Sequence, residues 1–379
     1  MTKQVVILGG GFAGIGIAHK LLKHTVPKAK GVKVTLISAS SHLYWNLAAV
    51  RGVIPGEISD EALFTPIADG FKRFPASQFE FLVGTASTLD TTSNLVHITT
   101  EQGVRAVGYD HLVVATGSST TTGLPFKHLS SYEDTIDSLH DLQSRIKAAK
   151  SIIIAGGGAT GVETAGELGF AYGRKKEITL VVEGPRVLSG LRPEVGKAAE
   201  NYLQKLNVHL VHNVKVTESE ASDVKQVVTL SNGKTLTADV YLPLFGVKPN
   251  TDFIPAHLLD VRGNLQLQNT LRVVGLSNVW GVGDVGNLEN KQAMKAETQV
   301  IHLAKNLDAV LTGHENLVKQ YKVDDKPMIF VTTGKKKGTG QMGTMKAPSF
   351  LVSYAKGRTL FLDKAPGLVA GKHLVSSSV

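Results

Sequence analysis

The stretch VVILGGGFAG at residues 5–14 decides which fold to expect from this sequence. Its first four residues are typical of a short buried strand in a parallel sheet. The glycines that follow match the pattern G-x-G-x-x-G, and apolar residues then continue at helical spacing to Leu22. A second apolar run, VKVTLI at residues 32–37, predicts another strand. Strand, glycine loop, helix and strand in this order predict a unit that binds a dinucleotide.

Each glycine of this loop has its own task in such a unit. The first permits a tight turn, the second lets a pyrophosphate approach the backbone, and the third lets the helix pack closely on the strand. The amide groups at the start of the helix then face the phosphates. The residues expected to bind the first dinucleotide are therefore Gly9, Gly11, Phe12, Ala13 and Gly14.

The same pattern occurs a second time. The run SIIIAGGGATG at residues 151–161 precedes a helical segment and a strand, ITLVV at 178–182, which leads into Glu183. This acid lies 22 residues beyond Gly161, about where a carboxylate accepts hydrogen bonds from an adenosine ribose. Because a carboxylate repels a 2′-phosphate, NADH is expected here, although nearby Arg186 keeps NADPH as an alternative. The residues expected to bind are Gly156, Gly158, Ala159, Thr160, Gly161 and Glu183.

The first copy lacks an acid at the end of its second strand, which reads Ile37-Ser38. A serine hydroxyl can still hydrogen-bond a ribose, but a neutral partner does so more weakly than a carboxylate. We therefore expect Ser38 to contact the first cofactor and to lower the affinity for it.

Composition excludes several classes of protein. The 379 residues contain no cysteine, which excludes disulfides, iron–sulfur clusters and the redox-active dithiol of disulfide reductases. The 13 histidines show no metal-ligand spacing, so no metal site is expected. No apolar run is long enough to cross a bilayer. A strand beginning near Gln4 leaves no room for a cleaved leader, and Met1-Thr2-Lys3 lacks the glycine needed for myristoylation, so a cytoplasmic location is expected.

The net charge of +9 is concentrated near the end of the chain. Residues 322–379 hold ten Lys and Arg against three Asp, a net charge of +7. Two interpretations remain open: a solvated basic surface, or a contact with an anionic partner such as a lipid surface, a nucleic acid or cofactor phosphates. The sequence shows no interleaved aromatic platform and no recognised binding module, so nucleic acid is the less favoured partner.

Two further segments, YDHLVVATGS at 109–118 and NVWGVGD at 278–284, complete a resemblance to flavoprotein reductases with two dinucleotide-binding domains. Within that superfamily the chain resembles the apoptosis-inducing-factor-like group. It is most similar there to the ferroptosis-suppressor (mitochondrion-associated inducer of death) branch, which is related to type II NADH dehydrogenases. The local matches are NLAAVR at 46–51, residues 156–163, GKKKGTGQ at 334–341 and AKGRTLF at 355–361.

The resemblance implies an α/β fold with two Rossmann-like dinucleotide-binding domains. An FAD domain (1–117 and 245–321) is split by an inserted NADH domain (118–244), and a small C-terminal α+β domain (322–379) caps the flavin. The implied activity is that of an FAD-dependent NAD(P)H:quinone oxidoreductase. Further cofactor-binding residues that it implies are Asn46, Arg51, Ala115, Thr116, Gly117, Gly246, Gly283 and Asp284.

The resemblance also implies chemistry for four side chains. Glu163 is expected near the contact of nicotinamide and flavin, with a helix-terminal acid as its alternative reading. Lys356 is expected near the flavin as a proton-handling group, and its alternative is a surface lysine. Type II dehydrogenases carry Ala-Gln-x-Ala-x-Gln on the helix after the Gly-Asp motif, of which this sequence keeps only Gln299 in register. Lys295 and Gln299, spaced i and i+4, are weak candidates for the acceptor site.

Three functions therefore stay open: an NADH:quinone oxidoreductase working at or near a membrane such as a lipid droplet, the plasma membrane or the mitochondrial surface; a reductase of an acidic protein such as a ferredoxin; and a nucleic-acid-binding, signalling flavoprotein. In the first, the basic C-terminal domain supplies a peripheral contact with anionic lipid. The second predicts rates that fall with added salt. The sequence leaves the acceptor and the number of assembled chains undecided.

Overall fold

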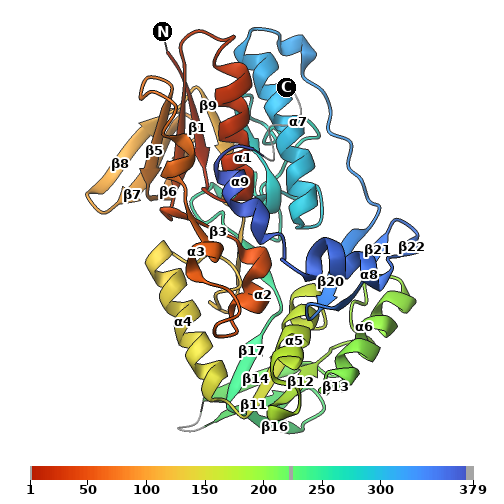
Figure 1. Ribbon diagram of the computed structural model, residues 1–379. Coiled ribbons are helices and arrows are strands. Elements are labelled where there is room, and N and C mark those ends of the chain that lie inside the picture. Colours follow the sequence, from red (N-terminus) through yellow and green to blue (C-terminus); the bar gives the residue numbers. More distant parts are fainter. Residues whose placement is uncertain (1, 222–224, 373–379) are drawn as a thin grey trace.

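The computed structural model describes residues 2–221 and 225–372 (Figure 1). The strands before and after the first glycine loop belong to a five-stranded parallel sheet. The strands lie in the order β19-β9-β1-β2-β5. Their runs are apolar rather than alternating because helices or other elements cover both faces of the sheet. The bounds are β1 (Lys3–Leu8), β2 (Val32–Ser38), β5 (Phe79–Val83), β9 (His111–Val114) and β19 (Val279–Gly281).

The strands before and after the second glycine loop belong to a second parallel sheet, with the strand order β13-β12-β11-β17. Its strands are β11 (Ser151–Ala155), β12 (Glu177–Val181), β13 (Val208–Val211) and β17 (Val240–Pro243). Two crossover helices, α5 (Ala159–Tyr172) and α6 (Pro193–Lys205), connect these strands. Parallel neighbours need such crossovers, so each glycine loop opens a βαβ unit as predicted.

The second sheet is an insertion between two strands of the first. The chain leaves the first sheet at β9 and returns to it at β19. The two passages lie side by side, because β10 (Ser118–Thr120) pairs antiparallel with β18 (Val247–Pro249). This arrangement confirms the predicted α/β class, while the predicted domain boundaries stay a prediction. Met1, residues 222–224 and residues 373–379, which those ranges include, lie outside the described residues.

In each unit an antiparallel three-stranded sheet comes just before the fourth strand, in chain order, of the parallel sheet. The first consists of β6 (Thr85–Asp90), β7 (Leu95–Thr100) and β8 (Gly103–Gly108), and β9 follows it. The second consists of β14 (Val216–Ala221), β15 (Gln226–Leu230) and β16 (Thr235–Ala238), and β17 follows it. The likeness of the two units therefore extends beyond their glycine loops.

The remaining helices pack against the two units. The loop helix α1 (Phe12–Lys20) packs against the long helix α7 (Ala293–Leu311), which the chain forms after returning to the first sheet. Ser131 caps α4 (Tyr132–Ala148), since its hydroxyl accepts a hydrogen bond from the amide of Asp134 at 2.9 Å. Shorter elements between β2 and β5 are β3 (His42–Tyr44), α2 (Ala49–Gly52), α3 (Asp60–Leu63) and β4 (Phe64–Pro66).

The C-terminal unit is a small antiparallel sheet with short helices. Its strand β20 packs on α5 and β21 on α6, so this unit lies against the helices of the second sheet (Figure 1). The chain then returns to the first sheet, where the backbone carbonyl of Val369 lies 2.6 Å from Nε2 of His19 in α1. The elements are β20 (Met328–Thr333), β21 (Lys337–Met342), β22 (Met345–Lys346), α8 (Ser349–Val352), a π-helical turn (Ser353–Gly357) and α9 (Ala365–Val369).

Candidate functional site

The first glycine loop passes directly over the crossing segment at residues 115–117. Gly9 has a φ of +115°, and a Cβ there would overlap the carbonyl oxygen of Ala115. A Cβ on Gly14 would overlap the carbonyl oxygen of Gly9, so only glycine lets α1 approach the loop this closely. A Cβ on Gly11, in contrast, meets nothing within 4 Å. The loop therefore keeps an open space beside the start of α1, as a pyrophosphate requires.

The second loop repeats this geometry residue by residue. Gly156 has a φ of +129°, and a Cβ there would meet the carbonyl oxygen of Leu244. A Cβ on Gly161 would overlap the carbonyl oxygen of Gly156, whereas one on Gly158 has nothing within 4 Å. The amides of Ala159 and the following residues open α5 at this space. Both loops therefore fit a dinucleotide, and each keeps its free space at the middle glycine of the motif.

The ends of the two second strands are not equivalent at Ser38 and Glu183. The strand register pairs Leu8 with Ile37 in the first unit and Ala155 with Val181 in the second. The position after each pair is thus Ser38 in one unit and Val182 in the other.

Glu183 lies one residue farther along, and the residue at the matching position of the first unit is Ala39. Ser38 is buried, and its hydroxyl accepts a hydrogen bond from the amide of Ser40 at 3.2 Å. Glu183 is exposed. The sequence pattern alone could not reveal this offset because it depends on how the strands pair. Val182, rather than Glu183, occupies the position that matches Ser38.

The Gly-Asp motif lies against the first loop. A Cβ on Gly283, whose φ is +80°, would be 3.4 Å from the Cβ of Ala13. Oδ2 of Asp284 accepts hydrogen bonds from the hydroxyl of Ser118 at 2.9 Å and from Nζ of Lys127 at 2.8 Å. Burial alone raises the pKa of Asp284, but the charge of Lys127 and these two hydrogen bonds outweigh it and hold that pKa below its usual value. Asp284 is therefore an anchored anion beside the open space.

Sequence reasoning missed Lys127 as a site residue. It stands in a loop without a motif, 157 residues before Asp284, so only the fold brings the two together. The crossing segment beside it is tied down as well: the hydroxyl of Thr116 donates to the carbonyl of Asn250 at 2.7 Å, and the Asn250 amide donates back to the carbonyl of Thr116 at 2.9 Å. Gly117 and Gly246, with φ of +69° and +74°, allow the two passages to turn there.

Glu163 and Lys356, both proposed as catalytic from the resemblance, form an ion pair. Nζ of Lys356 lies 2.6 Å from Oε1 of Glu163, and their side chains are only 12% and 6% exposed. The amide of Thr332 donates to the same carboxylate oxygen at 2.8 Å, and Lys356 also donates to the carbonyl of Phe330 at 3.1 Å. A surface lysine does not fit this burial. The pair joins α5 of the second sheet to the C-terminal unit.

Arg51, expected to contact cofactor, directs its guanidinium at protein groups. It forms a two-pronged salt bridge with Glu167, with N–O distances of 2.8 Å on both prongs. It also donates to the carbonyls of Gly357 at 2.7 Å and Arg358 at 3.1 Å. Burial raises the pKa of Glu167 in spite of the hydrogen bonds and charge of Arg51. Arg51 therefore fastens the first sheet domain to α5 and to the segment that carries Lys356.

Asn46, named with Arg51 in the same local match, begins the 3-10 turn Asn46–Ala48 that leads into α2, and its side chain is half-buried. The turn is held by its own backbone, because the amide of Ala48 donates to the carbonyl of Trp45 at 3.0 Å. The segment that places Asn46 therefore also places Arg51 beside Glu167.

Lys295 and Gln299 share one face of α7, as their spacing predicts, and both contact Glu289. Oε1 of Gln299 accepts a hydrogen bond from the amide of Gly283 at 2.8 Å, and its Nε2 donates to Glu289 at 2.8 Å. Lys295 donates to the carbonyl of Asp324 and lies 3.4 Å from Oε1 of Glu289. Glu289, which belongs to no recognised motif, has a buried side chain and also accepts a hydrogen bond from the hydroxyl of Tyr321 at 2.7 Å.

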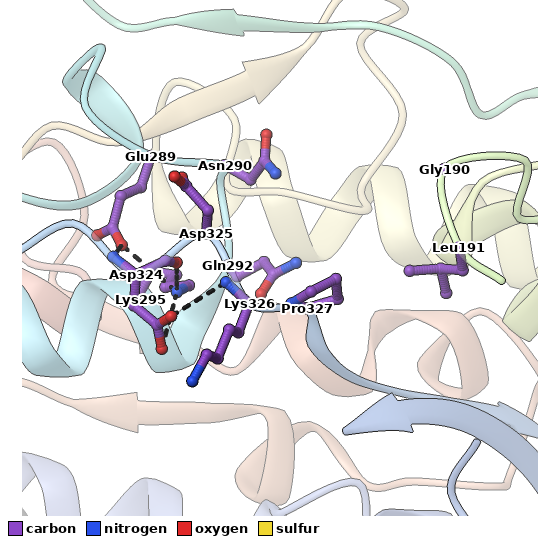
Figure 2. Close-up of a pocket in the computed structure, with 10 residues that line it drawn as sticks. All are labelled: Gly190, Leu191, Glu289, Asn290, Gln292, Lys295, Asp324, Asp325, Lys326 and Pro327. Carbon is purple, nitrogen blue, oxygen red and sulfur yellow. Dashed lines mark hydrogen bonds and ion pairs between the residues drawn. The ribbon is translucent and has the colours of Figure 1, made fainter. Parts of the chain in front are cut away.

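A pocket of about 110 Å³ lies beside Lys295, between the start of α7, the loop after β12 and the segment leading into β20 (Figure 2). Figure 2 shows Glu289, Lys295 and Asp324 joined by ion pairs on one side of it, with Gly190 and Leu191 on the other. Its lining is therefore mixed polar and apolar and is drawn from three parts of the fold. The lining residues are Gly190, Leu191, Glu289, Asn290, Gln292, Lys295, Asp324, Asp325, Lys326 and Pro327.

Within residues 2–221 and 225–372 no cluster of His, Asp and Glu could hold a metal ion. No helix in the same part of the chain is long and apolar enough to cross a membrane.

Comparison with known proteins agrees with this geometry. Residues 3–304 match the family described as "Pyridine nucleotide-disulphide oxidoreductase". The chain belongs to this family. It is 41% identical over 374 residues to "Oxidoreductase ptaL" of Pestalotiopsis fici, covering 98% of this chain and 100% of that protein. It is 28% identical over 373 residues to "Ferroptosis suppressor protein 1" of Xenopus tropicalis, covering 96% and 94%.

Solved structures with the same fold cover nearly the whole chain. The sulfide:quinone oxidoreductase of Aquifex aeolicus superposes with a TM-score of 0.79 at 18% identity, covering 99% of this chain and 93% of that one. NDH2 of Plasmodium falciparum superposes with a TM-score of 0.76 at 13% identity, covering 99% and 100%. At these identities the likeness establishes the fold alone.

The predicted resemblance to the apoptosis-inducing-factor and ferroptosis-suppressor group is thereby confirmed. So are the predicted cofactors, FAD and NAD(P)H, and the assignment as an oxidoreductase. Because the sequence has no cysteine, the disulphide in the family's description does not apply to this member. The individual binding residues predicted from the sequence stay predictions, now with the geometry given above.

Proposed function

We propose that this enzyme takes a hydride from NADH onto FAD and passes the electrons to a quinone. When bound, the nicotinamide and flavin supply the hydride and electron chemistry, and the protein positions them and excludes water. The observation that carries the proposal is the buried Lys356–Glu163 pair, which lies where the helix after the NADH loop meets the C-terminal unit. Full reduction of a quinone to a quinol needs two electrons and two protons. The hydride from NADH supplies both electrons but only one of the protons.

The second proton has to come from solvent through the protein. Nζ of Lys356 is a nitrogen donor with little exposure, and Glu163 and the carbonyl of Phe330 hold it in place. A proton given up from Nζ can be replaced because the side chain is still 12% exposed. This arrangement supplies a general acid for the acceptor half of the reaction.

The first loop and the Gly-Asp motif support FAD, and the second loop supports NADH. Lys127 and Ser118 hold the carboxylate of Asp284 at the edge of the first open space. Exposed Glu183 disfavours a 2′-phosphate near the second. NADH is therefore the proposed donor, and NADPH is the weaker alternative.

Visible absorption spectra test the proposal in two steps. A flavin spectrum that bleaches on anaerobic addition of NADH, and bleaches more slowly with NADPH, is the expected first result. Addition of a short-chain benzoquinone should then restore the oxidised spectrum. A protein that bleaches with NADH but stays reduced in the presence of quinones would refute the quinone acceptor while leaving the flavoprotein assignment intact.

Long-chain quinones reside in lipid bilayers, so we further propose that the enzyme meets its acceptor at a membrane surface. The support is the net charge of +7 in residues 322–379, since the inner leaflets of cells carry anionic lipids.

A further inference from the structure

The C-terminal unit exposes three large apolar side chains close together in the chain. Met345, Phe350 and Tyr354 are 67%, 77% and 69% exposed. Phe350 and Tyr354 stand i and i+4 on the continuous helical stretch formed by α8 and the π-helical turn after it, so both point to one side. Val352, on the other side of the stretch, is fully buried and packs on Gly338 of β21. The helical stretch thus turns an apolar face to solvent as well as one to the core.

Cations surround this exposed face. Lys336 is exposed in the turn between β20 and β21, and Lys337 is exposed at the start of β21. That turn lies alongside the helical stretch, because the hydroxyl of Ser353 donates to the carbonyl of Lys335 at 3.0 Å. Lys346 precedes the stretch, and the guanidinium of Arg358 after it lies 5.0 Å from the ring centre of Tyr354.

Acids are missing from the same region. The sequence has no Asp or Glu from Lys326 to Leu362. Two of its lysines are neutralised from outside: Lys335 pairs with Glu57 at 2.6 Å, and Lys356 pairs with Glu163. In the part of the chain that the structure describes, no salt bridge engages the four remaining cations of the face. Glu194 in α6 has its pKa lowered mainly by its hydrogen bond to Arg192 and only slightly by the charge of Lys346. The four cations are Lys336, Lys337, Lys346 and Arg358.

We propose that these seven residues form a docking face that binds the surface of an anionic lipid bilayer. Aromatic rings and a methionine surrounded by cations match such a surface, since the rings enter the headgroup region while the cations meet anionic lipid. Two of the elements that carry the face, α8 and β22, lie at the outer edge of the molecule in Figure 1.

The docking face also sits next to the proposed chemistry. Tyr354 and Lys356 belong to the same π-helical turn, where Tyr354 is exposed and Lys356 reaches inward to Glu163. Docking therefore brings the bilayer against the segment that carries the proposed proton donor. The inference rests on the proposed function only in this last step, because lipid binding can be measured without turnover.

The test is flotation of the FAD-loaded protein with vesicles of phosphatidylcholine alone and of phosphatidylcholine with phosphatidylserine. We expect binding to the mixed vesicles, weakened about tenfold or more in Phe350→Ser/Tyr354→Ser, because two aromatic side chains that would enter the headgroup region are lost. Lys336→Glu/Lys337→Glu should lose binding to phosphatidylserine most strongly, and added salt should do the same to the wild type. Val261→Ser, which removes a fully exposed apolar side chain outside the C-terminal unit, is the matched control and should bind unchanged.

Two outcomes overturn the inference. Equal vesicle binding by the wild type and Phe350→Ser/Tyr354→Ser excludes the face. A wild-type dimer in light scattering that this variant abolishes assigns the face to a second copy of the chain instead. Turnover of NADH with a short-chain quinone checks that the variant is intact. A wild-type protein that binds the vesicles but reduces no quinone would refute the proposed function and leave the docking face standing.

Discussion

At the scale of single residues, Arg51 carries an unusual share of the contacts between parts of the fold. Its guanidinium pairs with Glu167 of α5 and donates to the carbonyls of Gly357 and Arg358, and both ionic side chains are nearly inaccessible. A buried pair of this kind adds little to stability over apolar residues of the same size, but loss of one partner strands a charge. The pair therefore specifies how the units fit together.

We expect Arg51→Leu to lower the free energy of unfolding by about 3–5 kcal/mol, because Glu167 is left buried without its partner. The double variant Arg51→Leu/Glu167→Leu should recover a large part of the loss. Chemical denaturation followed by tryptophan fluorescence measures both, with Arg145→Leu, at an exposed pair with Asp141, as the control for loss of an arginine. Equal losses in Arg51→Leu and Arg145→Leu would contradict the account.

The Glu163–Lys356 pair leads to a kinetic prediction. Lys356→Met should slow reoxidation by a short-chain quinone on the order of 10²-fold, since a general acid typically contributes that much or more. Reduction by NADH should change much less. Anaerobic stopped-flow separates the two half-reactions. A variant that is slowed equally in both would indicate that Lys356 only positions Glu163, and Lys356→Arg, which keeps the charge, should then restore the rate.

His19 gives a pH dependence of stability. Burial lowers its pKa from 6.5 to about 4, opposed by its bond to the carbonyl of Val369 and aided by the charge of Arg73. Between these two pH values the unfolded chain binds a proton that the folded chain does not, so stability falls as pH falls from 6.5 towards 4. Relative to His19→Phe, the wild type should lose about 3 kcal/mol of unfolding free energy over this range. Parallel pH profiles for the two proteins would show that His19 does not titrate this way.

At the scale of elements, the two glycine loops give matched tests of their cofactors. A Cβ on Gly11 or Gly158 meets nothing within 4 Å, and both residues have negative φ values that any amino acid tolerates. Gly11→Val should therefore fold but lose FAD and purify colourless. Gly158→Val should stay yellow but no longer bleach at NADH concentrations that reduce the wild type. Absorbance spectra and unfolding midpoints check both variants.

The third glycines supply the contrast. A Cβ on Gly14 or Gly161 would overlap a backbone carbonyl, so alanine at either position should destabilise the protein itself. A Gly158→Val protein with a lowered unfolding midpoint and a Gly161→Ala protein with a normal one would reverse the assignment of tasks among the glycines.

Local elements were predictable from the sequence, whereas contacts between elements were not. The strands, the loops and the helix after each loop follow from short patterns, whereas Glu163 and Lys356 were implied by the family resemblance. Their pairing across 193 residues could not be predicted, because it depends on how β20 packs on α5. Lys127 and Glu289 lie in loops without a motif. The offset between Ser38 and Glu183 depends on strand register, which a pattern of apolar residues fixes only to within a residue or so.

At the scale of the whole molecule, the fold stacks two similar units and lays a third, basic unit against the second. The C-terminal unit touches α5 and α6 on one side and returns to α1 on the other. It is thus the part that meets both cofactor units, and it also carries the docking face. This placement separates two kinds of acceptor, because a dissolved neutral quinone needs no docking whereas a quinone within a bilayer does.

The two acceptors should therefore respond differently to salt. Reduction of a short-chain benzoquinone should be insensitive to ionic strength, since a neutral molecule is not steered by charge. Reduction of a long-chain quinone held in phosphatidylserine vesicles should fall steeply between low and high salt, because screening weakens contacts of Lys336 and its neighbours with lipid. In Lys336→Glu/Lys337→Glu the vesicle rate should already be low and no longer depend on salt. Steady-state NADH oxidation measures all of these rates. A steep salt dependence with an added acidic redox protein, and none with vesicles, would instead favour a protein acceptor.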